Sequence, residues 1–147
     1  YRKLSESLVD KITEFFPNMS GSWTHSAPLP GGDFDGPYQL KLDLRIAFPW
    51  LPYSIISRYV RCYGTLSYAI LQDANSIDSL GRHFGAGLYE KEVDYLVQQE
   101  WARTADDIIW RRTKLGLFLQ ADEVADLASY LAATDEAKKV STQSQVA

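Results

Sequence analysis

The sequence contains a single cysteine, Cys62, so the chain cannot form an internal disulfide. This excludes the small secreted domains that depend on disulfides and favours a reducing compartment. Long apolar runs are also absent, which excludes a membrane-spanning helix of about 18 residues or more. Basic residues are in deficit: 15 Lys and Arg stand against 19 Asp and Glu, a net charge of −4. This balance argues against nucleic acid as a partner, because phosphate binders carry a basic surplus.

Signatures of cofactor and metal binding are missing from the 147 residues. Residues 81–87 (GRHFGAG) resemble a phosphate-binding loop, but Glu90 occupies the third glycine position of G-x-G-x-x-G. Their glycines are therefore interpreted as turn positions that need a positive φ. His25 and His83 lie 58 residues apart, and neither has a Cys or His at ligand spacing, so no metal site is predicted.

Acid–base and nucleophilic groups show no catalytic arrangement either. The carboxylate pairs Glu90/Glu92 and Asp106/Asp107 have no pocket implied around them, and we expect both on solvated helix faces. Cys62 has no general base nearby in the sequence and is interpreted as a buried or incidental thiol.

Proline divides the chain unevenly, because all six prolines lie between Pro17 and Pro52. Irregular structure is therefore expected in the first third, and the remainder is free to be helical. No alternating β-branched run of useful length indicates a strand. The predicted fold is all-α: one leading amphipathic helix, a long Pro/Gly loop, and a compact bundle of about five to six helices.

The leading helix is predicted over residues 1–16, because apolar residues recur on one helical face, namely Leu4, Leu8, Ile12 and Phe15. The chain enters this helix almost at once, which is typical of a piece of a longer chain. Residues 17–36 form the loop, in which Trp23 and Phe34 are expected to lie against a surface.

The bundle helices are predicted over residues 37–48, 53–63, 66–73, 88–101, 105–113 and 123–137. Pro37 is a favoured first helical residue, Gly64 a helix stop and Thr65 a helix cap. The polar tail from about residue 139 is expected to fray.

A charged motif lies in residues 104–114 (TADDIIWRRTK). Thr104 and Asp107 fit a capping box, and Asp107 can pair with Arg111 one turn later. Trp110 is predicted to belong to the core. The basic side chains Arg111, Arg112 and Lys114 form either a structural charge network or an anion or partner site, and the sequence leaves both open.

Residues 46–57 (IAFPWLPYSIIS) are uncharged for 12 residues and are flanked by Arg45 and Arg58. Aromatic residues beside basic ones, here Trp50 and Tyr53, suit a lipid interface. A buried corner between two helices produces the same pattern, and the two interpretations remain open.

Several segments, in the same order, resemble one family. EWARTADDIIWRRTKLGL at 100–117 is similar to the C-terminal region of the FAD-dependent, membrane-associated glycerol-3-phosphate dehydrogenases. The resemblance covers residues 1–133 and includes YRKLSESL at 1–8, WTHSAPLPGGDF at 23–34, YGTLSYAILQDA at 63–74 and LGRHFGAGLYEKEVDYLV at 80–97.

The resemblance implies a complete enzyme that oxidises glycerol 3-phosphate to dihydroxyacetone phosphate, with FAD passing electrons to a membrane quinone. It implies that residues 1–36 are the last helix of the FAD domain plus a crossover loop, and that 37–147 are the helical C-terminal cap domain. The family's dinucleotide fingerprint is absent here. The chain alone is therefore expected to be inactive, with no catalytic residue and no bound FAD.

Tyr1 and Arg2 adjoin the position of the family's flavin-contacting segment and are the only residues that the resemblance places near FAD. Its implied partners are the chain's own FAD domain, the quinone and a membrane surface at the cytoplasmic face, while a homo-oligomer stays open. The alternative is an independent helical interaction module that binds a partner through residues 110–112 or the Pro49 corner.

Overall fold

The computed structural model describes residues 1–16 and 18–144, and over these ranges the chain is helical without a strand. The helices are α1 (Arg2–Ile12), α2 (Pro37–Ala47), α3 (Tyr53–Tyr63), α4 (Ser67–Leu71), α5 (Glu90–Gln99) and α6 (Ala121–Ser144). Shorter turns are η1 (Thr13–Phe15), η2 (Gly64–Leu66), η3 (Asp78–Leu80), the π-helical η4 (Asp107–Arg112) and η5 (Leu115–Leu117). The all-α prediction is confirmed.

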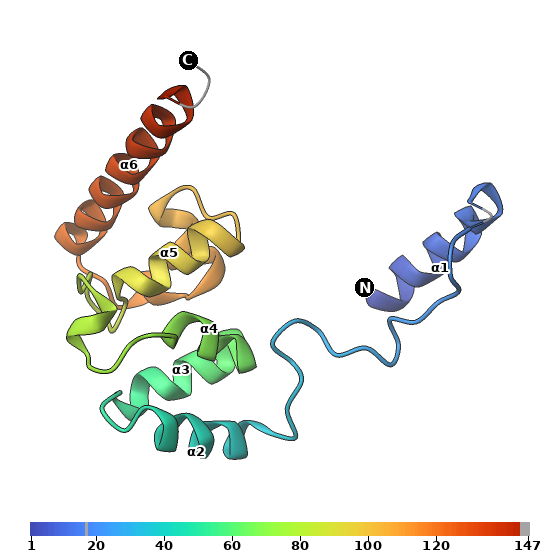
Figure 1. Ribbon diagram of the computed structural model, residues 1–147, viewed down its shortest axis with the longest axis horizontal. Helices are drawn as coiled ribbons and strands as arrows, with labels where there is room; N and C mark the ends of the chain where they lie inside the picture. Colours follow the sequence, from blue (N-terminus) through green and yellow to red (C-terminus); the bar gives the residue numbers. More distant parts are fainter. Residues whose placement is uncertain (17, 145–147) are drawn as a thin grey trace.

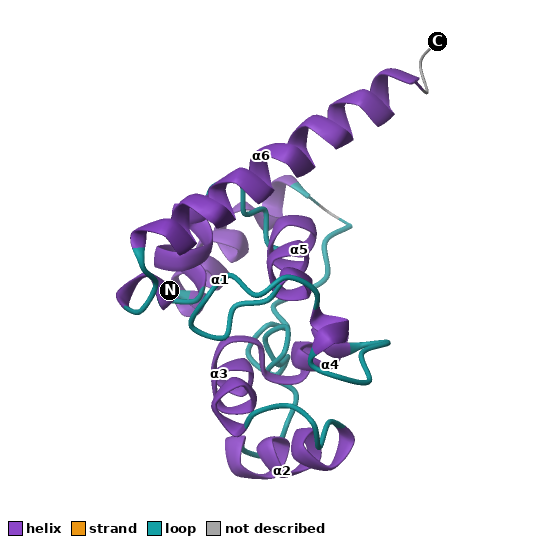
Figure 2. Cartoon of the chain, turned by 90° about the vertical axis from the view of Figure 1, so that its left-hand side faces the viewer, coloured by secondary structure: helices purple, strands orange, loops and turns teal. Residues whose placement is uncertain are grey.

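Figure 1 shows α2 to α6 gathered into a bundle, from which α1 stands apart at the end of a long loop. The core runs through the bundle from α2 to α6. Leu44 of α2 packs with Ile56 and Tyr59 of α3, and the same cluster continues through Leu96 of α5 to Leu127 of α6. The view in Figure 2 shows α6 crossing over the α5 end of the bundle, with α2 at the opposite end.

The α2–α3 corner follows the sequence closely. Pro37 begins α2, which buries Leu40 and Leu44, and α3 spans the predicted residues Tyr53–Tyr63. Gly64 ends α3 with φ 55° and ψ −128°, a conformation that side chains disfavour. The glycines of the 81–87 loop also adopt positive φ at Gly81, Gly85 and Gly87, as predicted.

The end of the crossover loop is fastened to the bundle at Gly64. The Thr65 amide donates to the Gly31 carbonyl oxygen at 3.0 Å, and a Cβ on either Gly31 or Gly64 would overlap the backbone of the opposite segment. Phe34 packs on the core next to this contact. Trp23 does not reach the core: 61% of this residue is exposed, and it lines a cavity between the loop and α1.

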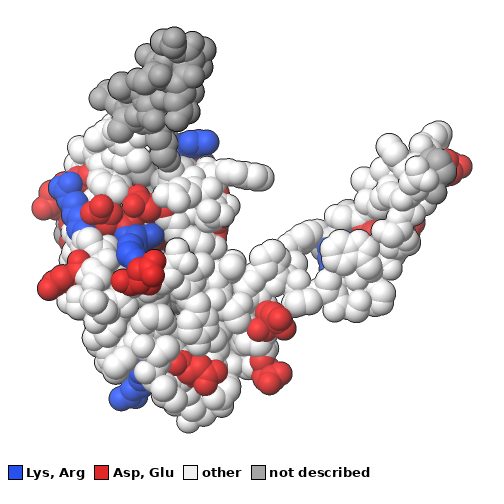
Figure 3. Space-filling model, in the orientation of Figure 1, with Lys and Arg blue, Asp and Glu red and all other residues white. Residues whose placement is uncertain are grey.

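Helix α1 buries none of its residues. Its apolar face, the one predicted from the helical spacing, consists of exposed side chains: Leu4, Leu8, Ile12 and, in η1, Phe15. The arm formed by α1 and the loop shows few charged side chains in the view of Figure 3. Polar contacts join α1 to the loop, including the Arg2 guanidinium, which donates to the Thr24 carbonyl oxygen at 3.2 Å.

Three expectations about helix ends need correction. Thr65 caps no helix: it lies within η2, and α4 starts two residues later without a side-chain cap. The 105–113 segment winds mainly as the π-helical η4. The backbone of α6 continues to Ser144, so the tail expected to fray from about residue 139 is helical up to that point, and 145–147 lie outside the described residues. No helix in the described part of the chain combines the length and apolarity needed to cross a membrane.

Candidate functional site

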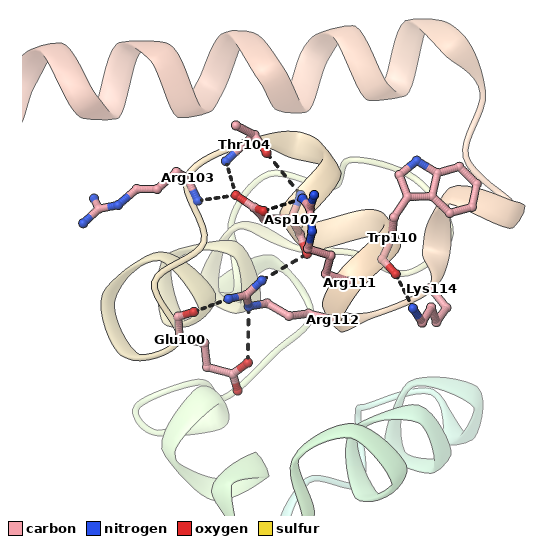
Figure 4. Close-up of polar contacts among 8 residues, drawn as sticks. All are labelled: Glu100, Arg103, Thr104, Asp107, Trp110, Arg111, Arg112 and Lys114. Carbon is pink, nitrogen blue, oxygen red and sulfur yellow. Dashed lines mark hydrogen bonds and ion pairs between the residues drawn. The ribbon is translucent and has the colours of Figure 1, made fainter.

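Figure 4 shows the charged motif around Asp107 at the start of η4. The Asp107 carboxylate accepts the backbone amides of Arg103 and Thr104, each at 3.0 Å, and the Thr104 hydroxyl accepts the Asp107 amide. Arg111 pairs with the same carboxylate at 2.7 Å. The predicted capping box and ion pair are confirmed. The backbone amides of Arg103 and Thr104 hold the pKa of Asp107 well below its usual range, so this cap stays ionised at neutral pH.

The remaining basic side chains of the motif also bind within the chain (Figure 4). The Arg112 guanidinium donates to the Glu100 carbonyl oxygen, and its Nε lies 3.6 Å from the Glu100 carboxylate. The Lys114 ammonium donates to the Trp110 carbonyl oxygen. These contacts favour the structural interpretation for Arg111 and Arg112. The prediction that Trp110 lies in the core is wrong: 44% of it is exposed, because its ring covers Gly116 at the surface.

The least expected polar group lies inside the bundle, where Arg58 of α3 pairs with Glu92 of α5. Arg58 donates to Glu92 Oε2 at 2.7 Å and to the Gly87 carbonyl oxygen at 2.8 Å. The Tyr63 hydroxyl donates to Glu92 Oε1 at 2.6 Å. Glu92 is completely buried, so its predicted place on a solvated helix face is wrong. Glu92 precedes the buried Leu96 by one helical turn, and this register was the available signal.

Burial and charge act together on the ionisable groups around this pair. Burial raises the pKa of Tyr59 and of Tyr63 well above the usual tyrosine value, and the Glu92 carboxylate raises both further. Burial opposes the charge on Arg58, but the hydrogen bond and the charge of Glu92 outweigh it and raise the guanidinium pKa. The Arg58 guanidinium therefore remains charged at neutral pH and lies against the Glu92 carboxylate. Since each is bonded inside the chain, the pair serves the packing of α3 on α5.

A groove of about 1010 Å³ opens beside this pair, between α3 and the segment that runs from η4 through η5. The groove joins motifs that the sequence presents separately. Its walls include Arg58, Arg61 and Cys62 of α3, residues 112–115, 117 and 118, and the turn residues Ala86 and Gly87. Burial raises the pKa of the Cys62 thiol, which agrees with an unreactive cysteine.

Part of the 46–57 corner fits a buried corner between two helices, and part fits a lipid interface. Leu51, Ile55 and Ile56 are buried, and Trp50 is half-buried against Phe48 with ring centroids 6.0 Å apart. Ile46, by contrast, is 80% exposed, and Tyr53 of the same corner is exposed too. The packing of this corner accounts for most of its apolar residues but leaves Ile46 and Tyr53 at the surface.

Tyr1 and Arg2, the two positions predicted to lie near FAD, stand at the start of α1, outside the bundle, and Figure 1 marks the N-terminus at the end of α1 nearer to the bundle. They line a cavity of about 840 Å³ between α1 and residues 19–30 of the loop. Among the side chains that the structure describes, no three His, Cys, Asp or Glu residues come close enough together to hold a metal ion.

Comparison with known proteins assigns the bundle to a family. Residues 22–142 match the model of the C-terminal domain of alpha-glycerophosphate oxidase. The chain belongs to this family. The match takes in the loop that fastens to Gly64 and all the helices after it, and leaves out α1.

Curated relatives agree with the family assignment. The chain is 44% identical over 132 residues to a glycerol-3-phosphate dehydrogenase of Pseudomonas aeruginosa and 39% identical over 132 residues to the aerobic glycerol-3-phosphate dehydrogenase of Escherichia coli. Each match covers 89% of this chain and 26% of the relative. A D-erythritol 1-phosphate dehydrogenase of Brucella abortus is 42% identical over 127 residues, which is 85% of this chain and 25% of that protein. The chain thus spans about a quarter of these relatives.

Proposed function

We propose that this chain is the C-terminal helical domain of a longer FAD-dependent dehydrogenase that oxidises glycerol 3-phosphate to dihydroxyacetone phosphate. The observation that carries the proposal is the family match over residues 22–142, together with relatives of that activity at 44% and 39% identity. In the whole protein, FAD would accept the hydride from the substrate carbon and pass the electrons on to a quinone.

The role proposed for the bundle itself is structural. Its buried charged groups, Arg58 and Glu92, bind each other, and the Asp107 motif caps its own helical turn. A catalytic acid or base needs a group that can exchange a proton with substrate, and neither motif offers one. We therefore expect the domain to bind no FAD and to oxidise no substrate on its own. The family match over most of the chain counts against the alternative of an independent interaction module.

The first proposed partner is the FAD domain of the same polypeptide, which would cover the apolar face of α1. Four large side chains of this face are exposed to solvent, namely Leu4, Leu8, Ile12 and Phe15. Exposed apolar surface at this helical spacing is typical of a face that packs on another element. Tyr1 and Arg2 at the start of α1 would then lie near the flavin.

A membrane surface at the cytoplasmic face is the second proposed partner, and it would give the whole enzyme access to quinone. Ile46 and Tyr53 support this proposal as exposed apolar side chains beside Arg45. Cosedimentation of the whole polypeptide with phosphatidylglycerol vesicles tests it: Ile46→Ser should reduce the bound fraction, and an unchanged fraction would assign the membrane contact elsewhere. A homo-oligomer is compatible with this arrangement.

Dye-linked substrate oxidation tests the proposed activity. We expect the whole polypeptide to copurify with flavin and to reduce a dye with glycerol 3-phosphate, and the 147-residue chain to do neither. D-Erythritol 1-phosphate is the matched competitor, because a relative named for that substrate is 42% identical. A higher kcat/KM for D-erythritol 1-phosphate would replace the proposed substrate, and oxidation by the chain alone would refute the structural role.

A further inference from the structure

The groove between α3 and the η4–η5 segment is lined by positive charge, although the chain as a whole is negative. Four of its lining side chains are cationic, Arg58, Arg61, Arg112 and Lys114, and among the side chains that the structure describes no Asp or Glu lines it. The chain as a whole carries a net charge of −4. A concave surface lined by one sign of charge concentrates the opposite sign. The groove therefore selects for an anionic occupant.

Two of the four cations are free to meet that occupant. Arg58 is neutralised by Glu92, and Arg112 lies against Glu100. Arg61 is exposed and forms no ion pair with any side chain that the structure describes. The exposed Lys114 ammonium likewise has no carboxylate partner in that part of the chain and bonds only to a carbonyl oxygen.

Large apolar side chains form the other half of the lining. Leu117 is 72% exposed and Phe118 is 68% exposed, although they come only two and three residues after the buried Leu115. Pro52 and Ile55 add apolar surface on the α3 side. An occupant that matches the groove must therefore offer carboxylates and at least one apolar side chain together.

We propose that this groove docks an acidic segment of a partner protein, with its carboxylates at Arg61 and Lys114 and an apolar side chain between Leu117 and Phe118. The shape favours a polypeptide over a lipid surface, since a bilayer is met by residues that protrude and here the surface is concave. A volume of about 1010 Å³ lies at the upper end of the range for small-molecule pockets, roughly 300–1,000 Å³, and has room for a peptide segment.

The groove and the apolar face of α1 are different surfaces, so the two proposed partners do not compete for the same residues. The described lining residues of the groove all lie between positions 52 and 118, outside α1 and outside the crossover loop. A domain that covers α1 can thus leave the groove open. The proposal does not rest on the dehydrogenase activity.

Selection of a displayed random-peptide library against the whole polypeptide tests this site. We expect the selected peptides to combine Asp or Glu with Leu, Phe or Trp. Fluorescence anisotropy of a selected peptide should show at least tenfold weaker binding to the variant that combines Arg61→Glu and Lys114→Glu. The matched control is Arg45→Glu, an exposed arginine outside the groove, whose binding should stay within twofold of the wild type. Circular dichroism checks that each variant is folded.

Four results would overturn the proposal. The first is that no peptide in the library binds, and the second is that the selected peptides lack carboxylates. The third is equal binding to the wild type and to the Arg61/Lys114 variant. The fourth is a different occupant, either phosphatidylglycerol vesicles, followed by cosedimentation, or a second copy of the chain, followed by analytical ultracentrifugation. That occupant would bind the wild type but not the Arg61/Lys114 variant, while peptide binding would be the same for both. Dye-linked activity is measured in parallel, so failure of the docking site is distinguishable from failure of the proposed enzyme function.

Discussion

Glu92→Gln should destabilise the bundle by about 3–5 kcal/mol, because it leaves the Arg58 guanidinium buried without a counter-charge. Glu92 is completely buried and accepts hydrogen bonds from Arg58 and Tyr63, and a neutral glutamine amide in its place would offer one acceptor oxygen instead of two. The free energy of unfolding is measured from urea denaturation followed by circular dichroism.

Two comparisons isolate the buried charge as the cause. Asp126→Asn removes the partner of Arg82 in an ion pair whose side chains are partly exposed, and it should cost less than about 1 kcal/mol. The double variant Arg58→Met with Glu92→Leu removes both charges and should be more stable than Glu92→Gln, as apolar replacements of buried pairs often are. If Glu92→Gln lies within 1 kcal/mol of the wild type, the pair is not important for the stability of the bundle.

Gly64→Ala should cost about 3 kcal/mol or more, through two effects at one position. The backbone at φ 55° and ψ −128° is strained for any residue with a Cβ, which costs about 1–3 kcal/mol. The new methyl group would also overlap the Gly31 carbonyl oxygen and force the loop away from the bundle, a cost of about 1–3 kcal/mol for overpacking. Phe34 would lose its contact with the core as the loop moves.

Gly36→Ala is the matched control for this substitution. Gly36 ends the same loop with an extended φ of 166°, and a Cβ there has no neighbour within 4 Å. Alanine at this position should be neutral or slightly stabilising, because it lowers the entropy of the unfolded chain. Thermal unfolding of the two variants gives the test: equal Tm values for both would show that the loop is not fastened at Gly64.

Helix ends and helix faces were predictable where a local rule decides them. Pro37 and Gly64 mark the start of α2 and the end of α3, because proline and glycine act on the backbone whatever surrounds them. Thr104 and Asp107 could be paired in the same way, since a capping box closes within four residues.

Burial was less predictable, because it depends on segments that are distant in the sequence. Trp110 has the large apolar side chain that is typical of a core residue, yet it lies over Gly116 at the surface. Glu92 looks like a solvated residue, yet Arg58, 34 residues earlier in the chain, compensates its burial. The groove was missed for the same reason, since Arg61 and Lys114 are brought to it by different segments.

The central claim is that α2 to α6 form a self-sufficient domain, while α1 belongs to a surface completed by the rest of a longer protein. Amide hydrogen exchange, compared between the 147-residue chain and the whole polypeptide, tests it most directly. We predict that the amides of α3 and α5 are equally protected in both, and that the amides of α1 exchange rapidly in the chain alone but are protected in the whole polypeptide. Equal protection of α1 in the two, or rapid exchange of α3 in the chain alone, would contradict the claim.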